Sequence, residues 1–158
     1  MIRRAGPADA AALATLNSHV QALHVAWAPH RYLTSDPTAV VVFFDALLAR
    51  EDVIVALAES DGLDGYAVGS VQTREVSAFK HASVTMVLDQ IGVRSDRRGA
   101  GVGRALMGWM EAEGRARGCE QMQLEVLAVN EGARGFYERL GYLPEQVRYG
   151  KVILRDSG

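Results

Sequence analysis

Apolar and polar positions follow a helical period in the first third of the chain. The stripe residues recur at intervals of three and four, at Leu13, Leu16, Val20, Leu23 and Trp27. This spacing predicts one amphipathic helix. Pro7 suits a helix start, and Pro29 ends the pattern. Asp36 and Pro37 then open a second predicted helix, which runs to about Arg50.

The middle of the chain is rich in residues that favour strands. Val53–Glu59 and Tyr66–Arg74 flank a turn signal at Asp61-Gly62, which predicts an antiparallel hairpin. Ser83–Val93 is a third long strand candidate, and Ile2–Arg4 is a short first strand. Strands therefore dominate the centre of the sequence.

Helices and strands interleave again in the last third. A central helix shares one apolar face among Val102, Ala105, Leu106, Trp109 and Met110. Gly118 is a natural stop for this helix, and Gln121–Val126 is the next predicted strand. A short helix buries the stripe Ala133, Phe136, Tyr137 and Leu140. Gly141 ends that helix, and Val147–Leu154 is the last predicted strand. The order β-α-α-β-β-β-α-β-α-β predicts a mixed sheet covered by helices.

Composition narrows the classes of protein. The 158 residues predict a single domain over residues 1–158, and 49% hydrophobic with 23% charged residues is typical of a soluble globular protein. The net charge of −2 gives no general attraction to nucleic acid or to anionic lipid. No apolar run is long enough to span a membrane, and no export signal or metal-ligand spacing is visible. The lone Cys119 fits a reducing cytoplasm, so we expect a cytoplasmic protein without membrane, nucleic-acid or metal partners.

Glycines cluster where the third long strand gives way to the central helix. The segment reads Arg98-Gly99-Ala100-Gly101-Val102-Gly103-Arg104. The first N–H groups of a helix lack internal partners and lie at the positive end of its dipole, and glycine lets an anion approach them. Arg98 and Arg104 add cationic donors. The pattern indicates a phosphate site, although it lacks the lysine of a Walker A loop and has Arg104 where a dinucleotide fingerprint needs glycine. A glycine-rich corner that binds nothing is the alternative.

Two landmarks resemble the GCN5-related N-acetyltransferase (GNAT) family. The family signature [Q/R]-x-x-G-x-[G/A] is matched by Arg98–Gly103. A second landmark is matched in order and spacing by Asn130, Ala133, Tyr137 and Gly141-Tyr142. The resemblance implies an α/β (α+β) fold with a mixed, mainly antiparallel, twisted sheet of six to seven strands. Helices would cover both faces, and a central strand pair would splay apart.

The resemblance also implies acetyl-CoA as cosubstrate, with no metal. The pantetheine arm would pair with the backbone of Ile91, Gly92 and Val93, and Asn130 would hydrogen-bond the arm. Gly92 is compatible with a bulge or with a simple strand glycine. The pyrophosphate would lie on the N–H groups of Arg98, Gly99, Ala100, Gly101, Val102, Gly103 and Arg104.

Three residues are candidates for proton transfer. Tyr137 matches the family tyrosine that faces the sulfur of coenzyme A, which makes it the candidate for the general acid and a contact of the cofactor. The alternative is that Tyr137 is a core residue on the same apolar stripe as Phe136 and Leu140. Glu125 has the spacing of the glutamate base in bacterial ribosomal-protein alanine acetyltransferases, and its alternative is an outward-facing strand residue. Asp89 also interrupts an apolar strand near the predicted splay. We place Glu125 slightly ahead of Asp89, and a water chain could serve either.

The sequence therefore predicts an N-acetyltransferase in which a primary amine attacks acetyl-CoA directly in a ternary complex. The acceptor, a small amine or a peptide amine, is not encoded in a readable motif. The alternative is an acyl-CoA-binding sensor without catalysis. Retention of Tyr137 and of a candidate carboxylate favours the enzyme. A homodimer is plausible from the habit of the family alone.

Overall fold

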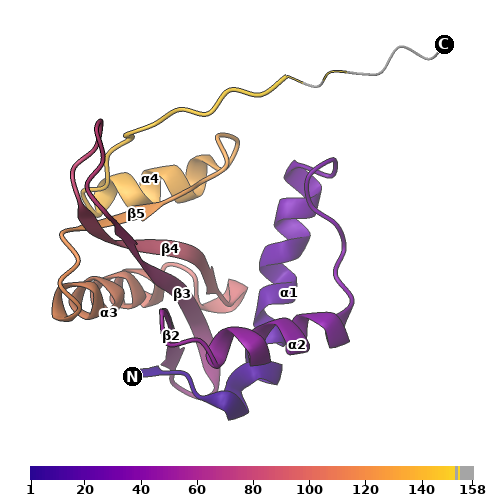
Figure 1. Cartoon of the computed structure of the whole chain (residues 1–158). Helices are drawn as coiled ribbons and strands as arrows, with labels where there is room; N and C mark the ends of the chain where they lie inside the picture. Colours follow the sequence, from indigo (N-terminus) through magenta and orange to yellow (C-terminus); the bar gives the residue numbers. More distant parts are fainter. Residues whose placement is uncertain (152, 154–158) are drawn as a thin grey trace. The chain divides into compact units, whose positions relative to one another are not determined.

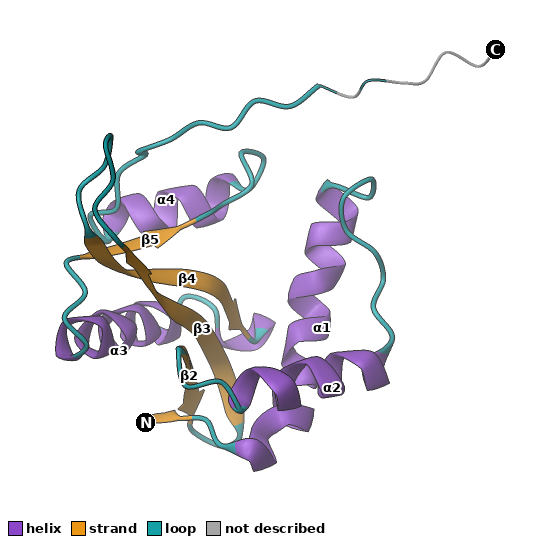
Figure 2. Ribbon diagram, viewed as in Figure 1, coloured by secondary structure: helices purple, strands orange, loops and turns teal. Residues whose placement is uncertain are grey.

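The chain forms two compact units in the computed structural model, which describes residues 1–151 and 153 (Figures 1 and 2). The first unit is Met1–Glu125 and the second is Val126–Gly158. All the described strands lie in the first unit. The candidate phosphate segment therefore belongs to the first unit, whereas Asn130 and Tyr137 belong to the second.

The sheet of the first unit has five strands whose order in space follows their order in the chain. They are β1 (Ile2–Arg4), β2 (Val53–Glu59), β3 (Leu63–Arg74), β4 (Ser83–Val93) and β5 (Gln121–Leu124). Neighbours pair antiparallel except β4 and β5, which pair parallel. The mixed, mainly antiparallel sheet is thus as predicted. Among the residues described it has five strands, fewer than the six to seven expected.

Three helices of the first unit begin close to where their sequence signals predict. A short 3₁₀ turn, Pro7–Asp9, leads into α1 (Ala10–Trp27). The carboxylate of Asp36 accepts a hydrogen bond from the Ala39 N–H and caps α2 (Pro37–Leu48). The third helix, α3, is Val102–Ala116. The Asp36 cap and Pro37 therefore set the start of α2, and Pro7 opens the turn before α1.

The helices cover both faces of the sheet (Figure 1). A Cβ atom on Gly92 of β4 would lie 2.8 Å from the Val20 side chain of α1. A Cβ atom on Gly65 of β3 would instead lie 3.0 Å from the Val102 side chain of α3. The buried cluster on the α1 and α2 face includes Leu13, Leu16, Phe44, Val55, Leu57, Tyr66 and Val68. These apolar contacts hold α1 and α2 to the face where the polar residues of the candidate site gather.

A β-bulge interrupts the pairing of β3 with β4. Val68 pairs with Gln90, but the next residue, Gly69, pairs with Leu88, so Asp89 is the extra residue. Gly92 pairs regularly with Tyr66, so of the two interpretations left open for Gly92 the bulge is not found. The simple strand glycine is the correct interpretation, because Tyr66 packs directly over it.

Substitution of Gly92 by alanine is expected to destabilise the fold by about 1–3 kcal/mol, the usual cost of overpacking. The added Cβ would lie 2.6 Å from Cε1 of the buried Tyr66 ring. Urea unfolding of the purified variant measures this. Gly108→Ala is the control, since Gly108 is exposed within α3 with nothing within 4 Å of its Cβ position. That change should raise stability by about 0.5–1 kcal/mol, and equal stability for both variants would contradict the packing argument.

The second unit contains the last helix, α4 (Glu131–Arg139). The Asn130 side chain caps its start, and Gly141 ends it with φ +92°. The last strand predicted at Val147–Leu154 is not formed over residues 147–151 or at residue 153. Residues 152 and 154 of that prediction lie outside the described residues.

Candidate active site

The glycine-rich connection links β4 to α3 through a 3₁₀ turn at Ser95–Arg97. Gly99 and Gly101 adopt φ values of +81° and +83°, in the left-handed region that favours glycine. A Cβ atom at either position would meet nothing within 4 Å. The backbone conformation, rather than packing against the protein, therefore requires glycine here, and the space beside both residues is open.

Several N–H groups of this connection have no protein partner. The first intrahelical bond of α3 runs from the Ala105 N–H to the Gly101 carbonyl. Arg98 and Ala100 donate at 3.4 Å to carbonyls of the preceding turn. Within residues 1–151 and 153, no acceptor is found for the N–H groups of Gly99 and 101–104. A run of such groups at the positive end of a helix suits an anion such as a pyrophosphate.

Two arginines beside this connection form no ion pair with a described residue. Four others in the same stretch pair with carboxylates, namely Arg94, Arg97, Arg115 and Arg117. Among the described residues, the Arg98 side chain donates only to the Val93 carbonyl, at 3.4 Å. In the described part of the chain, neither Arg98 nor Arg104 has a carboxylate within 4.0 Å. The positive charge that the sequence predicts for this stretch is therefore concentrated on these two side chains.

The parallel pair β4–β5 is short. Thr85–Leu88 pair with Gln121–Leu124, and the pairing stops there. On its other side β4 continues against β3 as far as Val93. The residues 89–93 therefore have no partner on β5, which is compatible with the splayed strand pair that the resemblance implies. Ile91, Gly92 and Val93, the predicted positions of the pantetheine arm, lie in this stretch.

Asp89 lies at the bulge as an exposed residue. Its Oδ2 accepts a hydrogen bond from the Ser70 hydroxyl at 3.0 Å. Desolvation by the surrounding protein raises the pKa of Asp89 above its ordinary value. The Ser70 hydrogen bond and the charge of Arg50 act in the opposite direction, and the charge of Asp52 adds to the rise. Asp89 is thus an accessible carboxylate with a raised proton affinity, as a general base requires.

A second group of polar side chains lies beside Asp89 on the face covered by α1. Asn17 Nδ2 donates to the Tyr66 hydroxyl at 2.8 Å and to Gln90 Oε1 at 3.0 Å. The Tyr66 hydroxyl donates to the same Gln90 oxygen at 3.1 Å, and burial raises the pKa of Tyr66 to about 12. The sequence analysis missed this group, although Asn17 interrupts an apolar helix face and Gln90 an apolar strand.

Glu125 lies just beyond the end of β5, which stops at Leu124. The predicted strand Gln121–Val126 is therefore too long. The Glu125 side chain is exposed, which fits the outward-facing interpretation rather than a costly carboxylate inside a strand. A catalytic role for Glu125 stays a prediction, without the burial that motivated it.

The second unit holds the remaining two predicted residues. Asn130 Oδ1 accepts a hydrogen bond from the Ala133 N–H at 3.0 Å, so this oxygen already caps α4. Tyr137 is buried, and burial raises its pKa to about 12. Its ring contacts Phe136 and Tyr142 edge to face or tilted, while its hydroxyl makes no hydrogen bond with any residue that the structure describes. The core and donor interpretations of Tyr137 are both compatible with these contacts.

Other reactive groups are few. No three metal-ligating side chains gather within the described ranges. The described helices include none with the length and apolarity needed to cross a membrane. Cys119 is partly buried, and burial raises the pKa of its thiol, so it is a weak nucleophile at neutral pH.

Comparison with known proteins agrees with this geometry. The chain matches the model of the acetyltransferase (GNAT) family over residues 18–142, and it belongs to that family. It is similar in fold to a mutant of the BH1408 protein from Bacillus halodurans, with 23% identity, a TM-score of 0.92, and 98% of this chain and 99% of that chain covered. It is also similar to the aminoglycoside N-acetyltransferase AAC(6')-Iy in complex with CoA, with 20% identity, a TM-score of 0.76 and coverages of 96% and 93%. A transcriptional regulator from Bacillus halodurans C-125 has the same fold, with 18% identity, a TM-score of 0.77 and coverages of 97% and 99%.

Proposed function

We propose that this protein is an N-acetyltransferase that moves an acetyl group from acetyl-CoA to a primary amine. The observation that carries the proposal is the connection between β4 and α3 in a chain of the GNAT family. Among the described residues, the N–H groups of Gly99 and 101–104 have no protein acceptor, and two glycines of the connection are in the left-handed region with open space beside them. This arrangement suits the pyrophosphate of coenzyme A without a metal.

The proposed cosubstrate site extends from this connection along β4. The N–H groups of Gly99 and 101–104 would bind the pyrophosphate, with Arg98 and Arg104 as cationic donors. The backbone of Ile91, Gly92 and Val93 would pair with the pantetheine arm where β5 provides no partner. The resemblance to the GNAT family further implies that Asn130 contacts the arm, and its amide nitrogen is the atom proposed to donate, because its oxygen caps α4. The CoA complex of the aminoglycoside N-acetyltransferase of similar fold supports this choice of ligand.

Asp89 is the better candidate for the base than Glu125. The bulge directs the Asp89 carboxylate to the face that also carries Ser70 and Gln90. The raised pKa of Asp89 brings its proton affinity closer to that of a useful base. Glu125 is exposed outside the strand. The order of the two candidates inferred from the sequence is therefore reversed in this proposal.

The reaction proceeds by direct attack in a ternary complex. An alkylammonium has a pKa of about 10.4, so it must lose a proton before it can attack. Asp89 takes this proton, and the neutral nitrogen forms a bond to the thioester carbonyl carbon. The C–S bond then breaks, and the sulfur leaves with a hydrogen bond from the Tyr137 hydroxyl. The attacking nitrogen then loses one of its two protons to the thiolate, and Asp89 returns its proton to solvent. The products are an N-substituted amide and the free thiol.

The acceptor is proposed to be a small amine or a peptide amine that approaches from the α1 face of the sheet. The polar group of Asn17, Tyr66 and Gln90 lies on this face with Asp89. Side chains of His24 and Tyr32 stack at 4.9 Å near the end of α1, where Trp27 is 36% exposed. Such a surface offers hydrogen bonds and aromatic contacts to a cation.

Calorimetry with acetyl-CoA followed by a thiol-release assay tests the function. We expect saturable binding of acetyl-CoA, and release of free thiol only when a suitable amine from a panel of polyamines, aminoglycosides, amino acids and peptides is added. Reactions without acceptor measure background hydrolysis. Binding without amine-dependent release across the panel would favour the acyl-CoA sensor. Absence of acetyl-CoA binding would reject both functions.

A further inference from the structure

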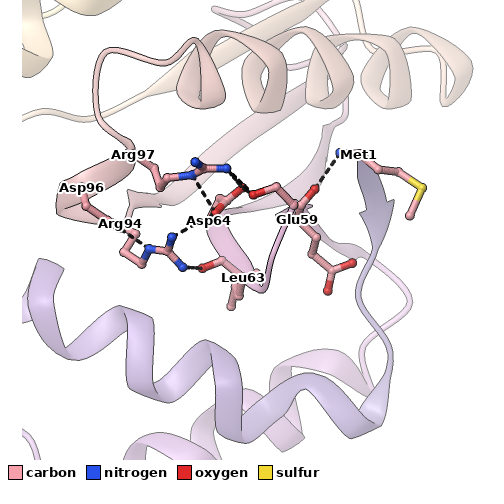
Figure 3. A network of polar contacts seen from close by, with 8 residues as sticks. Met1, Glu59, Leu63, Asp64, Arg94, Asp96 and Arg97 are labelled. Atoms are coloured by element: carbon pink, nitrogen blue, oxygen red, sulfur yellow. Dashed lines mark hydrogen bonds and ion pairs between the residues drawn. The ribbon is translucent and has the colours of Figure 1, made fainter.

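A buried carboxylate lies at the base of the glycine-rich connection. Asp64 is the second residue of β3 and is only 4% exposed. Two arginines from the turn after β4 converge on it, as Figure 3 shows for Arg94 and Arg97. More than half of the fold's strand residues lie between these positions in the chain, so the contact is a tertiary one.

Asp64 is the centre of a network of hydrogen bonds and ion pairs. Arg97 Nε donates to Asp64 Oδ1 at 3.0 Å, and Arg97 Nη2 donates to Oδ2 at 3.2 Å. The Ser60 hydroxyl donates to Oδ2 at 2.6 Å and also accepts from Arg97. Arg94 completes the set, since its Nη2 lies 3.5 Å from Oδ1 and its backbone N–H donates to the Asp64 carbonyl at 2.8 Å. We call Ser60, Asp64, Arg94 and Arg97 the Asp64 clamp.

The clamp holds the chain immediately before the first glycine of the proposed pyrophosphate site. The Arg97 N–H donates to the Arg94 carbonyl, and the Arg97 carbonyl accepts from the Ala100 N–H. Beyond Arg97, the left-handed residues Gly99 and Gly101 allow the backbone many conformations. Because residues 94–97 are already held in place, the connection loses less conformational entropy when an anion binds its N–H groups.

The clamp also determines which arginines remain for a ligand. Arg97 is neutralised by Asp64, and Arg94 is shared between Asp64 and Asp96, to which its Nε donates at 2.6 Å. Hydrogen bonds from Ser60 and Arg97 hold the pKa of Asp64 below its ordinary value, so the carboxylate stays ionised at neutral pH. Arg94 and Arg97 consequently stabilise the turn through their carboxylate partners. Arg98 and Arg104 are the arginines proposed to contact the ligand.

We infer that Asp64 is a positioning residue for acetyl-CoA binding, which orders the pyrophosphate-binding connection by anchoring Arg94 and Arg97 without touching the ligand. This inference rests on the proposed function. A bidentate arginine–carboxylate pair has a defined geometry, which makes it suitable for fixing a turn. Because Asp64 is buried, loss of its charge would leave the Arg97 guanidinium without a carboxylate partner, whereas Arg94 would keep Asp96.

The test measures binding of CoA and of pantetheine to the full-length protein by calorimetry. Asp64→Asn keeps the shape of the side chain but removes its charge, and Ser60→Ala removes a single hydroxyl from the clamp. Loss of hydrogen bonds to charged groups is expected to weaken CoA binding by about tenfold in Asp64→Asn. Binding of pantetheine, which has no pyrophosphate, should not change. In turnover assays the KM for acetyl-CoA should rise by a similar factor, with kcat at saturation within about twofold.

Asp9→Asn is the matched control. Asp9 also accepts two hydrogen bonds from one arginine, Arg3, both at 2.8 Å, but it lies in the turn before α1, where it also accepts from the Gly6 N–H. This variant should bind CoA as the wild type does, and thermal unfolding of all variants shows that they are folded. If Asp64→Asn and Ser60→Ala bind CoA as tightly as the wild type, or more tightly because freed arginines contact the phosphates, the positioning role is wrong. If the wild type itself binds no CoA, the proposed function fails and the positioning role fails with it.

Discussion

Replacement of Asp89 by asparagine is expected to lower kcat for an alkylamine acceptor by about 10²- to 10⁴-fold, the usual contribution of a general base. The amide keeps the shape of the side chain and can still accept a hydrogen bond from Ser70, but it cannot take a proton from an ammonium group. Steady-state kinetics at saturating acetyl-CoA and acceptor measure the loss.

The pH dependence gives the sign of this effect. Because the protein raises the pKa of Asp89, the wild-type rate should fall as the pH drops through a pKa higher than the ordinary value of an aspartate. Asp89→Asn should lack this acidic limb. A carboxylate with a raised pKa is less stable in its ionised form in the folded protein than in the unfolded chain. The variant should therefore be at least as stable to urea at pH 7 as the wild type.

Two controls separate the base from a structural role. Glu125→Gln removes an exposed carboxylate beyond β5 and should keep both the rate and the acidic limb. An arylamine acceptor is already neutral at pH 7, so its acetylation should be much less sensitive to Asp89→Asn than that of an alkylamine. A variant of Glu125 that loses the limb, with Asp89→Asn unaffected, would restore the order inferred from the sequence.

Local signals were sufficient for most helices and strands. Asp36 and Pro37 fix the start of α2, and the strand Ser83–Val93 has the predicted bounds. Such boundaries depend on capping groups and on side-chain periods within a few residues of each other. The end of β5 at Leu124 depends instead on where its parallel partner β4 departs from it, which no local pattern encodes.

The residues of the candidate site divide in the same way. The proposed anion site could be inferred from Gly99 and Gly101 because glycines at a helix start leave the backbone N–H groups accessible. In the structure both glycines adopt the left-handed conformation that favours this residue. The bulge at Asp89 could not be inferred, since it arises from the register between β3 and β4. Asp64 and Arg97 pair across distant parts of the chain, and neither residue type at its position indicates a tertiary partner. Position-specific motifs therefore revealed the proposed anion site, whereas its supporting contacts required the fold.

Replacement of Tyr137 by phenylalanine is expected to lower kcat by about 10²- to 10³-fold, the effect of removing a hydrogen-bond donor from a site of developing charge. The ring and its contacts with Phe136 and Tyr142 are kept, so the fold should be unchanged. The hydroxyl has no hydrogen-bond partner among the described residues, and its removal leaves no protein group unsatisfied there. Steady-state kinetics and calorimetry measure the rate and the affinity for acetyl-CoA.

The pKa of Tyr137, raised to about 12 by burial, determines how it would act. A thiol has an ordinary pKa of about 8.5, so complete proton transfer from Tyr137 to the thiolate would be uphill by about 5 kcal/mol. Tyr137 should therefore stabilise the leaving sulfur as a hydrogen-bond donor, and the proton should come in the end from the attacking nitrogen. The wild-type rate should then show no basic limb attributable to Tyr137 below pH of about 11. If the affinity of Tyr137→Phe for acetyl-CoA falls by as large a factor as its kcat, Tyr137 binds the cosubstrate without stabilising the transition state. If the variant has the rate of the wild type, Tyr137 has only a packing role in α4.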